Sequence, residues 1–400
     1  MDKQYAMLIR NNKRSLRLNN RWVRYLVFVI CGSVLFFLGL GVGHYKWPPF
    51  KLIYSLKSSL HQSLTPFKLA KEYQGEREIL QYAFTNPVNE ENLYYPPINS
   101  LRDIHDANNR IFMQQNNFEN AYQNLKVIDT QQIVRLNGSR PVVKVRFRYQ
   151  ERDYEAFAYG VLPKSCAEKK TSLASLVIPG SGINQSLGIA LNNPSNYHFG
   201  IMDSVLPWGK VYTFIKPNED FLAWHDGNGK KINGSFIWNW HLNRKGSYSV
   251  SYLVQTLAFT KWLQSCFTHV VVAGLSQGGA ATLLNGLQSK PTYAIVASGH
   301  SILNSLVEWS GSNQLIGVPG YANLGKPQHL AEMLRVSPTQ WFFSWGKGEI
   351  GTYKIEAEER RTGKYIEQLL NVSLVVHEGG HIFPTKEIRF WLSEQMLYPK

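Results

Sequence analysis

Residues 270–280 read Val-Val-Val-Ala-Gly-Leu-Ser-Gln-Gly-Gly-Ala. The β-branched run at the start is typical of a buried strand, and residues 280–287 are typical of a helix. Gly274 and Gly278 suit a sharp turn between them, because a Cβ at either position would collide with neighbouring backbone. The pattern therefore predicts a strand, a tight turn and a helix, with Ser276 pushed out at the carboxyl end of the strand as a candidate nucleophile.

The same turn places the amide of Gln277 at the start of the predicted helix, where an unpaired donor and the helix dipole stabilise an oxyanion. A second donor is expected from the loop after an earlier strand-like segment, Leu-Val-Ile at 176–178. That loop begins Pro-Gly-Ser-Gly at 179–182, and its glycines let the backbone approach a substrate carbonyl closely. We assign the amide of Ser181 as this second donor, with an ordinary glycine-containing turn as the alternative.

Two later strand-like segments each run into a polar, glycine-rich loop. Residues 341–345 lead into Gly-Lys-Gly-Glu, which ends at Glu349, and residues 374–376 lead into His-Glu-Gly-Gly-His, which ends at His381. An acid and then a histidine are expected in this order after a serine in such a turn. We therefore assign Glu349 as the acid and His381 as the general base.

Each of these assignments has an alternative. His377 is the alternative base, but it abuts the strand, whereas His381 follows two glycines in the loop that must reach over Ser276. The glutamates of the stretch 356–359 are alternatives to Glu349, but a charged, helix-like stretch is typical of a solvated face.

From about Val142 to its end the chain resembles an α/β-hydrolase. Its Gly-Leu-Ser-Gln-Gly-Gly-Ala at 274–280 is similar to the elbow of carboxylesterases and acyl-protein thioesterases, and the double glycine also occurs in dienelactone-hydrolase-like enzymes. Two residues depart from the usual pattern. Pro179 precedes Gly180 where a histidine is common, and Glu349 stands where an aspartate is commoner.

The resemblance implies an α/β fold with a mostly parallel central sheet flanked by helices. We expect antiparallel strands near 142–149 and 154–162 to precede the parallel units. The implied mechanism is attack by Ser276, with His381 as general base and then acid, and with Glu349 holding the imidazole tautomer. Such a reaction is expected to need no metal and no organic cofactor.

Three cysteines in 400 residues exclude a disulfide-rich scaffold and show no metal-ligand spacing. In the fold that the resemblance implies, the strands after Cys166 and Cys266 are neighbours. Both thiols should then lie at the amino-terminal edge of the sheet, opposite the site. We hypothesise a disulfide between them, which an oxidising compartment permits, with two unrelated buried cysteines as the alternative.

Residues 25–45 contain no Lys, Arg, Asp or Glu. At about 1.5 Å per helical residue, about 20 residues cross the hydrocarbon core of a bilayer. Trp22, Tyr25 and Tyr45 flank the segment as interfacial aromatics do. The segment predicts a single transmembrane helix, and a cleaved signal peptide is the alternative.

Seven Lys or Arg precede this segment, and only three follow it within residues 46–66. The positive-inside rule then predicts a cytoplasmic amino terminus, with the catalytic domain in a periplasm, a lumen or the extracellular space. Residues 1–71 hold +11 of the net charge of +15. The basicity therefore indicates anionic lipid rather than nucleic acid as its partner.

The predicted organisation has four parts. Residues 1–24 form a basic cytoplasmic tail, 25–45 the transmembrane anchor, 46–125 a stalk with an accessory helical region, and 126–400 the catalytic domain. Within the catalytic domain, the aromatic stretch 218–248 is a candidate cap over the pocket.

The predicted function is that of a membrane-anchored serine hydrolase. It is an esterase that cleaves carboxylic esters of an envelope or extracellular carbohydrate or lipid. Acyl transfer by the same triad is the nearest alternative, and a catalytically silent membrane-tethered scaffold is an alternative of another class. The sequence identifies a bilayer and an ester as partners, but no protein partner.

Overall fold

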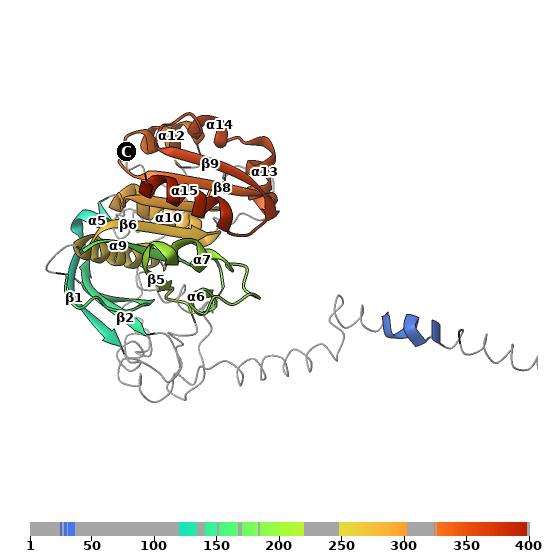
Figure 1. Ribbon diagram of the computed structural model, residues 1–400, viewed down its shortest axis with the longest axis horizontal. Helices are drawn as coiled ribbons and strands as arrows, with labels where there is room; N and C mark the ends of the chain where they lie inside the picture. The colour runs from blue at the N-terminus through green and yellow to red at the C-terminus, as the bar shows by residue number, and fades with distance from the viewer. Residues whose placement is uncertain are drawn as a thin grey trace, which may run out of the picture. The chain divides into compact units, whose positions relative to one another are not determined.

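The apolar run at 270–275, which begins with three β-branched valines, forms most of β6 (Phe267–Leu275), an inner strand of a nine-stranded sheet in the computed structural model (Figure 1). The strand order is β1-β2-β3-β5-β4-β6-β7-β8-β9. Pairing is antiparallel from β1 to β5 and parallel from β5 to β9. The mostly parallel α/β architecture that the sequence predicts is thereby confirmed. The other strands are β1 (Lys126–Ile133), β2 (Val142–Tyr149), β3 (Arg152–Tyr159), β4 (Lys170–Ile178), β5 (Gly209–Ile215), β7 (Tyr293–Ala297), β8 (Gln340–Gly348) and β9 (Val372–Gly380).

The structure describes the larger part of the predicted catalytic domain and a short piece near the amino terminus. Two compact units, Met1–Ala70 and Lys71–Lys400, are described separately. The candidate cap lies outside the described residues over 220–247, as does the predicted stalk up to residue 119. The described residues are 25, 28–29, 31–36, 120–133, 141–149, 152–166, 170–182, 185–219, 248–301, 324 and 326–397.

In the amino-terminal unit, residues 31–36 are helical. The remainder of the predicted anchor 25–45 lies largely outside the described residues. Across the part of the chain that the structure describes, no helix has both the length and the apolar character needed to cross a membrane.

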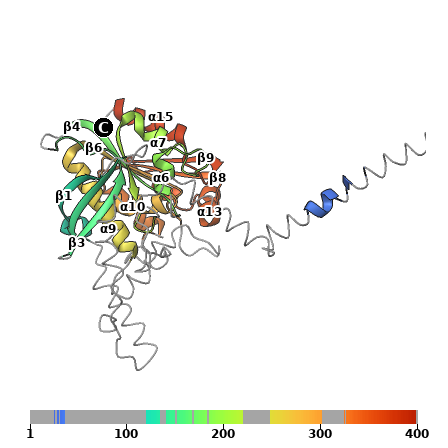
Figure 2. The ribbon, with the colours of Figure 1, turned by 90° about the horizontal axis from the view of Figure 1, so that it is seen from below.

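Helices cover both faces of the sheet, with α7 and α15 on one side and α9 and α10 on the other (Figure 2). The side chains of β6 alternate between two hydrophobic clusters, Val270 and Val272 in one and Val271 and Ala273 in the other. A strand buried on both faces explains the continuous β-branched run. The helices are α5 (Ala121–Asn124), α6 (Gln185–Ala190), α7 (Ile201–Val205), η3 (Leu206–Trp208), α9 (Tyr248–Cys266), α10 (Gln277–Ser289), α12 (Pro327–Arg335), α13 (Gly351–Glu359), α14 (Gly363–Ile366) and α15 (Thr385–Leu397).

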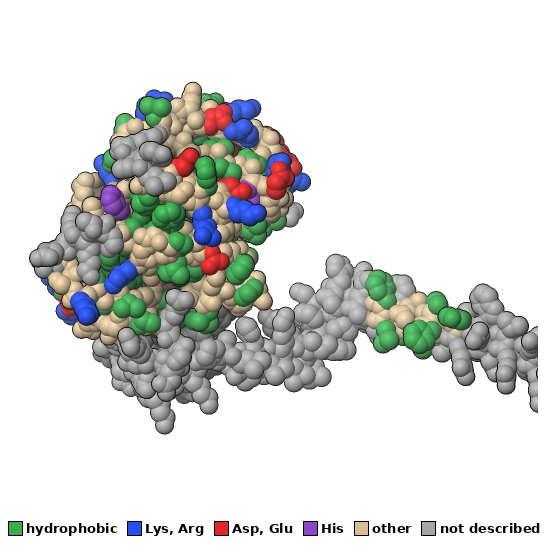
Figure 3. Space-filling view, viewed as in Figure 1, with side chains coloured by type: hydrophobic (Ala, Val, Ile, Leu, Met, Phe, Trp, Pro, Cys, Tyr) green, Lys and Arg blue, Asp and Glu red, His purple; other side chains and the backbone are tan. Residues whose placement is uncertain are grey.

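Positive and negative side chains are interspersed on the visible face of the carboxy-terminal unit (Figure 3). Several charged side chains of this unit pair, such as Arg148 with Asp153 at 2.7 Å and Lys354 with Glu358 at 3.6 Å. This distribution agrees with the sequence, which carries most of its excess positive charge within residues 1–71.

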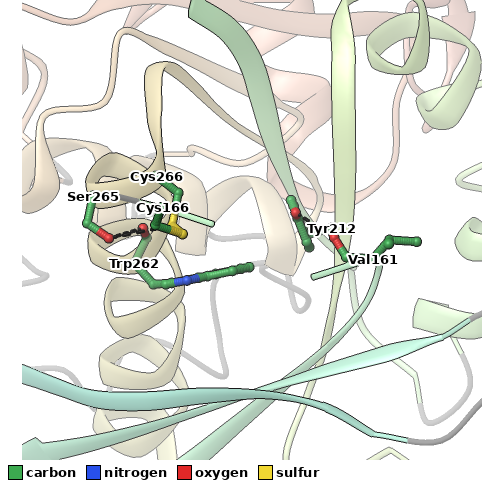
Figure 4. The surroundings of a disulfide bond; sticks show 6 residues. All are labelled: Val161, Cys166, Tyr212, Trp262, Ser265 and Cys266. Atoms are coloured by element: carbon green, nitrogen blue, oxygen red, sulfur yellow. Dashed lines mark hydrogen bonds between the residues drawn. A yellow bond between two sulfur atoms is a disulfide. The ribbon is translucent and has the colours of Figure 1, made fainter. Parts of the chain in front are cut away.

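A disulfide joins Cys166, in the segment before β4, to Cys266 at the end of α9 (Figure 4). Their Cα atoms are 4.3 Å apart. The bond lies where β4 and β6 begin, since Lys170 pairs with Phe267. The structure thus contains the hypothesised pair, at the amino-terminal edge of the sheet.

The disulfide closes a loop across a sequence separation of 100 residues. Replacing both Cys166 and Cys266 with Ser frees the unfolded chain, and we expect the free energy of unfolding to fall by about 2–4 kcal/mol. Urea unfolding followed by tryptophan fluorescence measures the change, and wild type in reductant serves as the control. Identical unfolding midpoints for the wild type with and without reductant would contradict a stabilising bond.

Candidate active site

Ser276 occupies the turn between β6 and α10 with φ 61° and ψ −126°, a conformation that non-glycine residues rarely adopt. The N–H of Ser276 donates to the carbonyl of Ala297 at the end of β7, and its own carbonyl accepts the N–H of Ala280, both at 3.0 Å. The neighbouring strand and the first turn of the helix therefore hold the serine in a strained position.

The glycines around the serine are required by close backbone contacts. A Cβ on Gly274 would collide with the carbonyl of Gly278, and one on Gly278 would collide with the carbonyl of Ile178. A Cβ on Gly279 would lie 2.6 Å from the carbonyl oxygen of Ala297. Backbone atoms cannot move aside as side chains do, so these positions need glycine, as the sequence predicts for Gly274 and Gly278.

Glu349 and His381 are brought together at the carboxyl ends of β8 and β9. The Nδ1 atom of His381 lies 2.7 Å from Oε2 of Glu349. The side chain of Glu349 is fully buried, and that of His381 is 14% exposed. With Nδ1–H donated to the carboxylate, Nε2 is left as the basic atom of the ring.

The carboxylate of Glu349 is itself fixed by further donors, among them the N–H of Ile350, which lies 3.4 Å from Oε2. Its Oε1 atom accepts a short hydrogen bond from the hydroxyl of Ser298 and a 3.1 Å hydrogen bond from the N–H of Gly346. Ser298 follows β7, and it is a functional residue that the sequence analysis missed. Its sequence signal is its place directly after an apolar strand, at the same edge of the sheet as the assigned acid.

The strands that carry the acid and the base run further than the sequence predicts. β9 continues to Gly380, and Gly348 of β8 still pairs with Gly380 beyond a register shift. A Cβ on Gly346 would collide with the carbonyl of Gly380, so the two backbones approach closely here. Residues 377–380, which read as a loop, are strand because β8 pairs with them.

His377, the alternative base, is not hydrogen-bonded to Glu349. Its Nδ1 atom accepts the N–H of Gly379 at 3.1 Å, and its Nε2 atom is buried without a hydrogen-bond partner among the described residues. Burial lowers the pKa of His377, and the negative charges of Glu387 and Glu349 partly offset that effect.

Of the alternative acids in the stretch 356–359, only Glu356 departs from the solvated face that the sequence suggests. Glu356 is buried and accepts hydrogen bonds from the N–H and the hydroxyl of Thr362, at 2.9 and 2.8 Å. It therefore fixes the turn after α13. Glu358 and Glu359 are exposed at the end of the same helix, as the sequence suggests.

The loop after β4, which carries Ser181, is held by the buried side chains of His198 and Lys216 and the half-buried side chain of Tyr197. The N–H of Gly180 donates to Nε2 of His198 at 2.7 Å, and the hydroxyl of Tyr197 donates to the carbonyl of Ser181 at 3.2 Å. Lys216 donates to the carbonyls of Gly180 and Gly182. The amide of Gly180 is thus already bonded, so that of Ser181 stays assigned as an oxyanion donor, together with that of Gln277.

His198 is held in its neutral form. Nδ1 lies 2.8 Å from Oδ1 of Asn196 and must donate, which leaves Nε2 to accept the N–H of Gly180. Burial lowers the pKa of His198 well below its ordinary value, and the positive charge of Lys216 adds to the effect. No pattern in the sequence identified His198 or Lys216 as part of the site.

Two further observations bear on what the site holds. The side chain of Gln277 is buried, and neither atom of its carboxamide has a hydrogen-bond partner in the described part of the chain. Within the same part, no group of three or more His, Cys, Asp or Glu side chains is placed to hold a metal ion.

No protein-family model and no curated protein matches the chain. Among solved structures, it is similar to Est1E from Butyrivibrio proteoclasticus, at 12% identity and a TM-score of 0.38, over 64% of this chain and 99% of that one. It is also similar to a CE15 glucuronoyl esterase from Teredinibacter turnerae T7901, at 14% identity and a TM-score of 0.43, over 79% and 91% of the two chains. A third is the esterase Pf2001 from Pyrococcus furiosus, at 12% identity and a TM-score of 0.37, over 69% and 91%. At this level of similarity the reaction has to be inferred from the chain's own site.

The neutral His198 makes stability depend on pH. Below about pH 6.5 the unfolded chain binds a proton at this residue that the folded chain does not, so stability falls as the pH is lowered. His198→Gln keeps an acceptor for the N–H of Gly180 and removes the titration. Between pH 6.5 and 5, we expect the slope of unfolding free energy against pH to be shallower than in wild type by up to about 1.4 kcal/mol per unit. Urea unfolding across this range measures both slopes, and equal slopes would contradict a neutral buried His198.

Proposed function

We propose that the chain is a serine hydrolase that cleaves carboxylic esters through an acyl-serine intermediate. The observation that carries the proposal is the 2.7 Å hydrogen bond between His381 and Glu349 at the edge of the sheet where the strained Ser276 also lies. A buried carboxylate that orients a histidine, at the sheet edge that also carries a serine in a strand-to-helix turn, suits the activation of a hydroxyl nucleophile.

In the proposed reaction, the hydroxyl oxygen of Ser276 attacks the ester carbonyl while Nε2 of His381 accepts its proton. The carbonyl oxygen becomes an oxyanion, and the amides of Gln277 and Ser181 donate to it. Collapse of the intermediate breaks the ester bond, and His381 protonates the departing alcohol. Water then attacks the acyl-serine by the same steps and releases the acid.

For the substrate, we propose an ester of a carbohydrate in preference to one of a lipid. The buried carboxamide of Gln277 stands next to the nucleophile without a hydrogen-bond partner among the described residues. An unpaired buried amide costs about 1–3 kcal/mol, which a hydroxyl-bearing substrate would offset. The ring of Tyr197, 6.0 Å from that of His381 between centroids, offers an aromatic face beside the base.

The chemistry is tested by the labelling rate of Ser276 with a fluorophosphonate in the full-length, detergent-solubilised protein. We expect Ser276→Ala to abolish labelling and His381→Ala to slow it by about 10³-fold or more, because the base is lost. His377→Ala is the matched control, since it removes the neighbouring histidine, which lies within β9, and it should label at nearly the wild-type rate. Loss of labelling in His377→Ala but not in His381→Ala would reverse the assignment of the base.

The substrate class is tested on the same preparation. Acetylated and feruloylated oligosaccharides are compared with long-chain acyl glycerols, with and without added alcohol acceptors. Faster release of acid from the saccharide esters is the expected result. Faster cleavage of the glycerol esters would show that the substrate is a lipid ester and not a carbohydrate ester. Transfer of the acyl group to an added alcohol would identify an acyltransferase. A folded wild type that does not label would instead favour the silent scaffold.

We further propose that residues 25–45 anchor the enzyme in a bilayer, with the catalytic domain on the non-cytoplasmic side. The support is the uncharged, apolar composition of the segment and the basic residues before it. The full-length chain should stay in the membrane pellet after alkaline carbonate washing, whereas a chain that starts at residue 46 should be released. Release of the full-length chain would contradict an integral anchor.

A further inference from the structure

Lys216 is a charged side chain buried completely beside the assigned oxyanion loop, residues 179–182. It follows β5, and its side chain has no exposed surface. Its ammonium donates a short hydrogen bond to the carbonyl of Gly180 and one of 2.8 Å to the carbonyl of Gly182. Burying a lysine ammonium costs free energy. Hydrogen bonds to two backbone carbonyls alone do not explain why the chain places one here.

The strand order puts the loop between this lysine and the nucleophile. β4 pairs with β5 on one side, where Val177 faces Thr213, and with β6 on the other, where Ile178 faces Gly274. The loop also contacts the elbow directly, since a Cβ on Gly180 would lie 2.9 Å from the carbonyl oxygen of Leu275. The loop therefore has Lys216 on its β5 side and Ser276 on its β6 side.

The geometry of the peptide group connects these two sides. The carbonyl of Gly180 and the N–H of Ser181 belong to one peptide bond, and no cis peptide occurs among the described residues. In a planar trans peptide the C=O and the N–H point in opposite directions. With the Gly180 carbonyl held on the β5 side by Lys216, the N–H of Ser181 points towards the β6 side.

We propose that Lys216 is a positioning residue for the oxyanion hole, because it binds the carbonyls of Gly180 and Gly182 and thereby turns the N–H of Ser181 towards the reacting oxygen. This inference rests on the proposed serine hydrolase mechanism. A peptide flipped the other way would present the Gly180 carbonyl to the oxyanion, where two negative oxygens would repel. The ammonium also polarises the peptide group whose N–H donates.

Glu219 supports the lysine. Its carboxylate is buried, lies 4.0 Å from the ammonium, and accepts the N–H of Ser186 at 3.1 Å on both oxygens. Burial lowers the pKa of Lys216 to about 8, and the charge of Glu219 partly opposes the shift. The ammonium therefore stays largely protonated at neutral pH.

The test is the rate of fluorophosphonate labelling of Ser276 in Lys216→Met, which keeps an unbranched side chain of nearly the same length and removes its donors. The phosphonyl oxygen occupies the same oxyanion hole, so we expect labelling to slow by about 10²-fold, as for the loss of one oxyanion donor. For any ester that the wild type hydrolyses, kcat should fall by a similar factor while KM changes little, because the donor acts mainly in the transition state.

A matched control distinguishes a role of Lys216 in positioning the N–H of Ser181 from a role that consists only of hydrogen bonding to backbone carbonyls. Lys261 of α9 likewise donates to two backbone carbonyls, those of Tyr122 and Leu125 at 2.8 and 2.6 Å. It lies in the last turns before Cys266, towards the opposite edge of the sheet. Lys261→Met should lower the melting temperature but label at the wild-type rate. Equal slowing of labelling in Lys216→Met and Lys261→Met would show that Lys216 only stabilises the fold, and it would overturn the inference.

A second variant keeps the test decisive if the first does not fold, since removing one partner of a buried ion pair leaves the other charge uncompensated. Lys216→Met combined with Glu219→Gln leaves neither charge, and the glutamine still bonds Ser186. Slow labelling of this folded variant supports the inference, and wild-type labelling overturns it. A folded wild type that does not label overturns the proposed function itself, an outcome distinct from equal labelling of wild type and variant.

Discussion

Contact between two backbone segments, the turn at Ser276 and the loop 179–182, is the constraint on which the site depends. The two follow neighbouring parallel strands, β6 and β4, and a Cβ on Gly278 would lie 2.8 Å from the carbonyl carbon of Pro179. No side chain fits between them, so the turn is built from glycines. The proposed nucleophile and both proposed oxyanion donors therefore form one backbone unit, and a shift in either segment displaces the other.

The sequence predicts the parts of this unit that depend on local pattern. The β-branched run, the glycine spacing around Ser276 and the apolar segments before Glu349 and His381 each lie within a few residues, so each can be read from the chain alone. The end of β9 could not be read in this way. Residues 377–380 form a strand only because β8 lies beside them, and that pairing joins positions distant in sequence.

The residues that sequence reasoning missed are polar groups buried by partners far along the chain. Lys216 and His198 both bind Gly180, and Glu356 binds Thr362, although patterns of charge place such side chains at the surface. Each is buried because backbone donors or acceptors satisfy it, which no local pattern reveals. A charged residue directly after an apolar strand at the edge that carries the nucleophile is the one signal that would have drawn attention to Lys216.

The two edges of the sheet affect the stability of the protein in opposite directions. The carboxyl edge carries a strained serine and the completely buried Lys216, both of which lower stability. The amino-terminal edge carries the disulfide between Cys166 and Cys266, which constrains the unfolded chain without touching the geometry of the site. Since β4 and β6 extend between the two edges, the bond secures the same two strands whose other ends hold the nucleophile and the loop. The disulfide therefore stabilises the protein at the sheet edge that carries no proposed catalytic group. It acts on β4 and β6, the two strands that must stay fixed for the proposed chemistry.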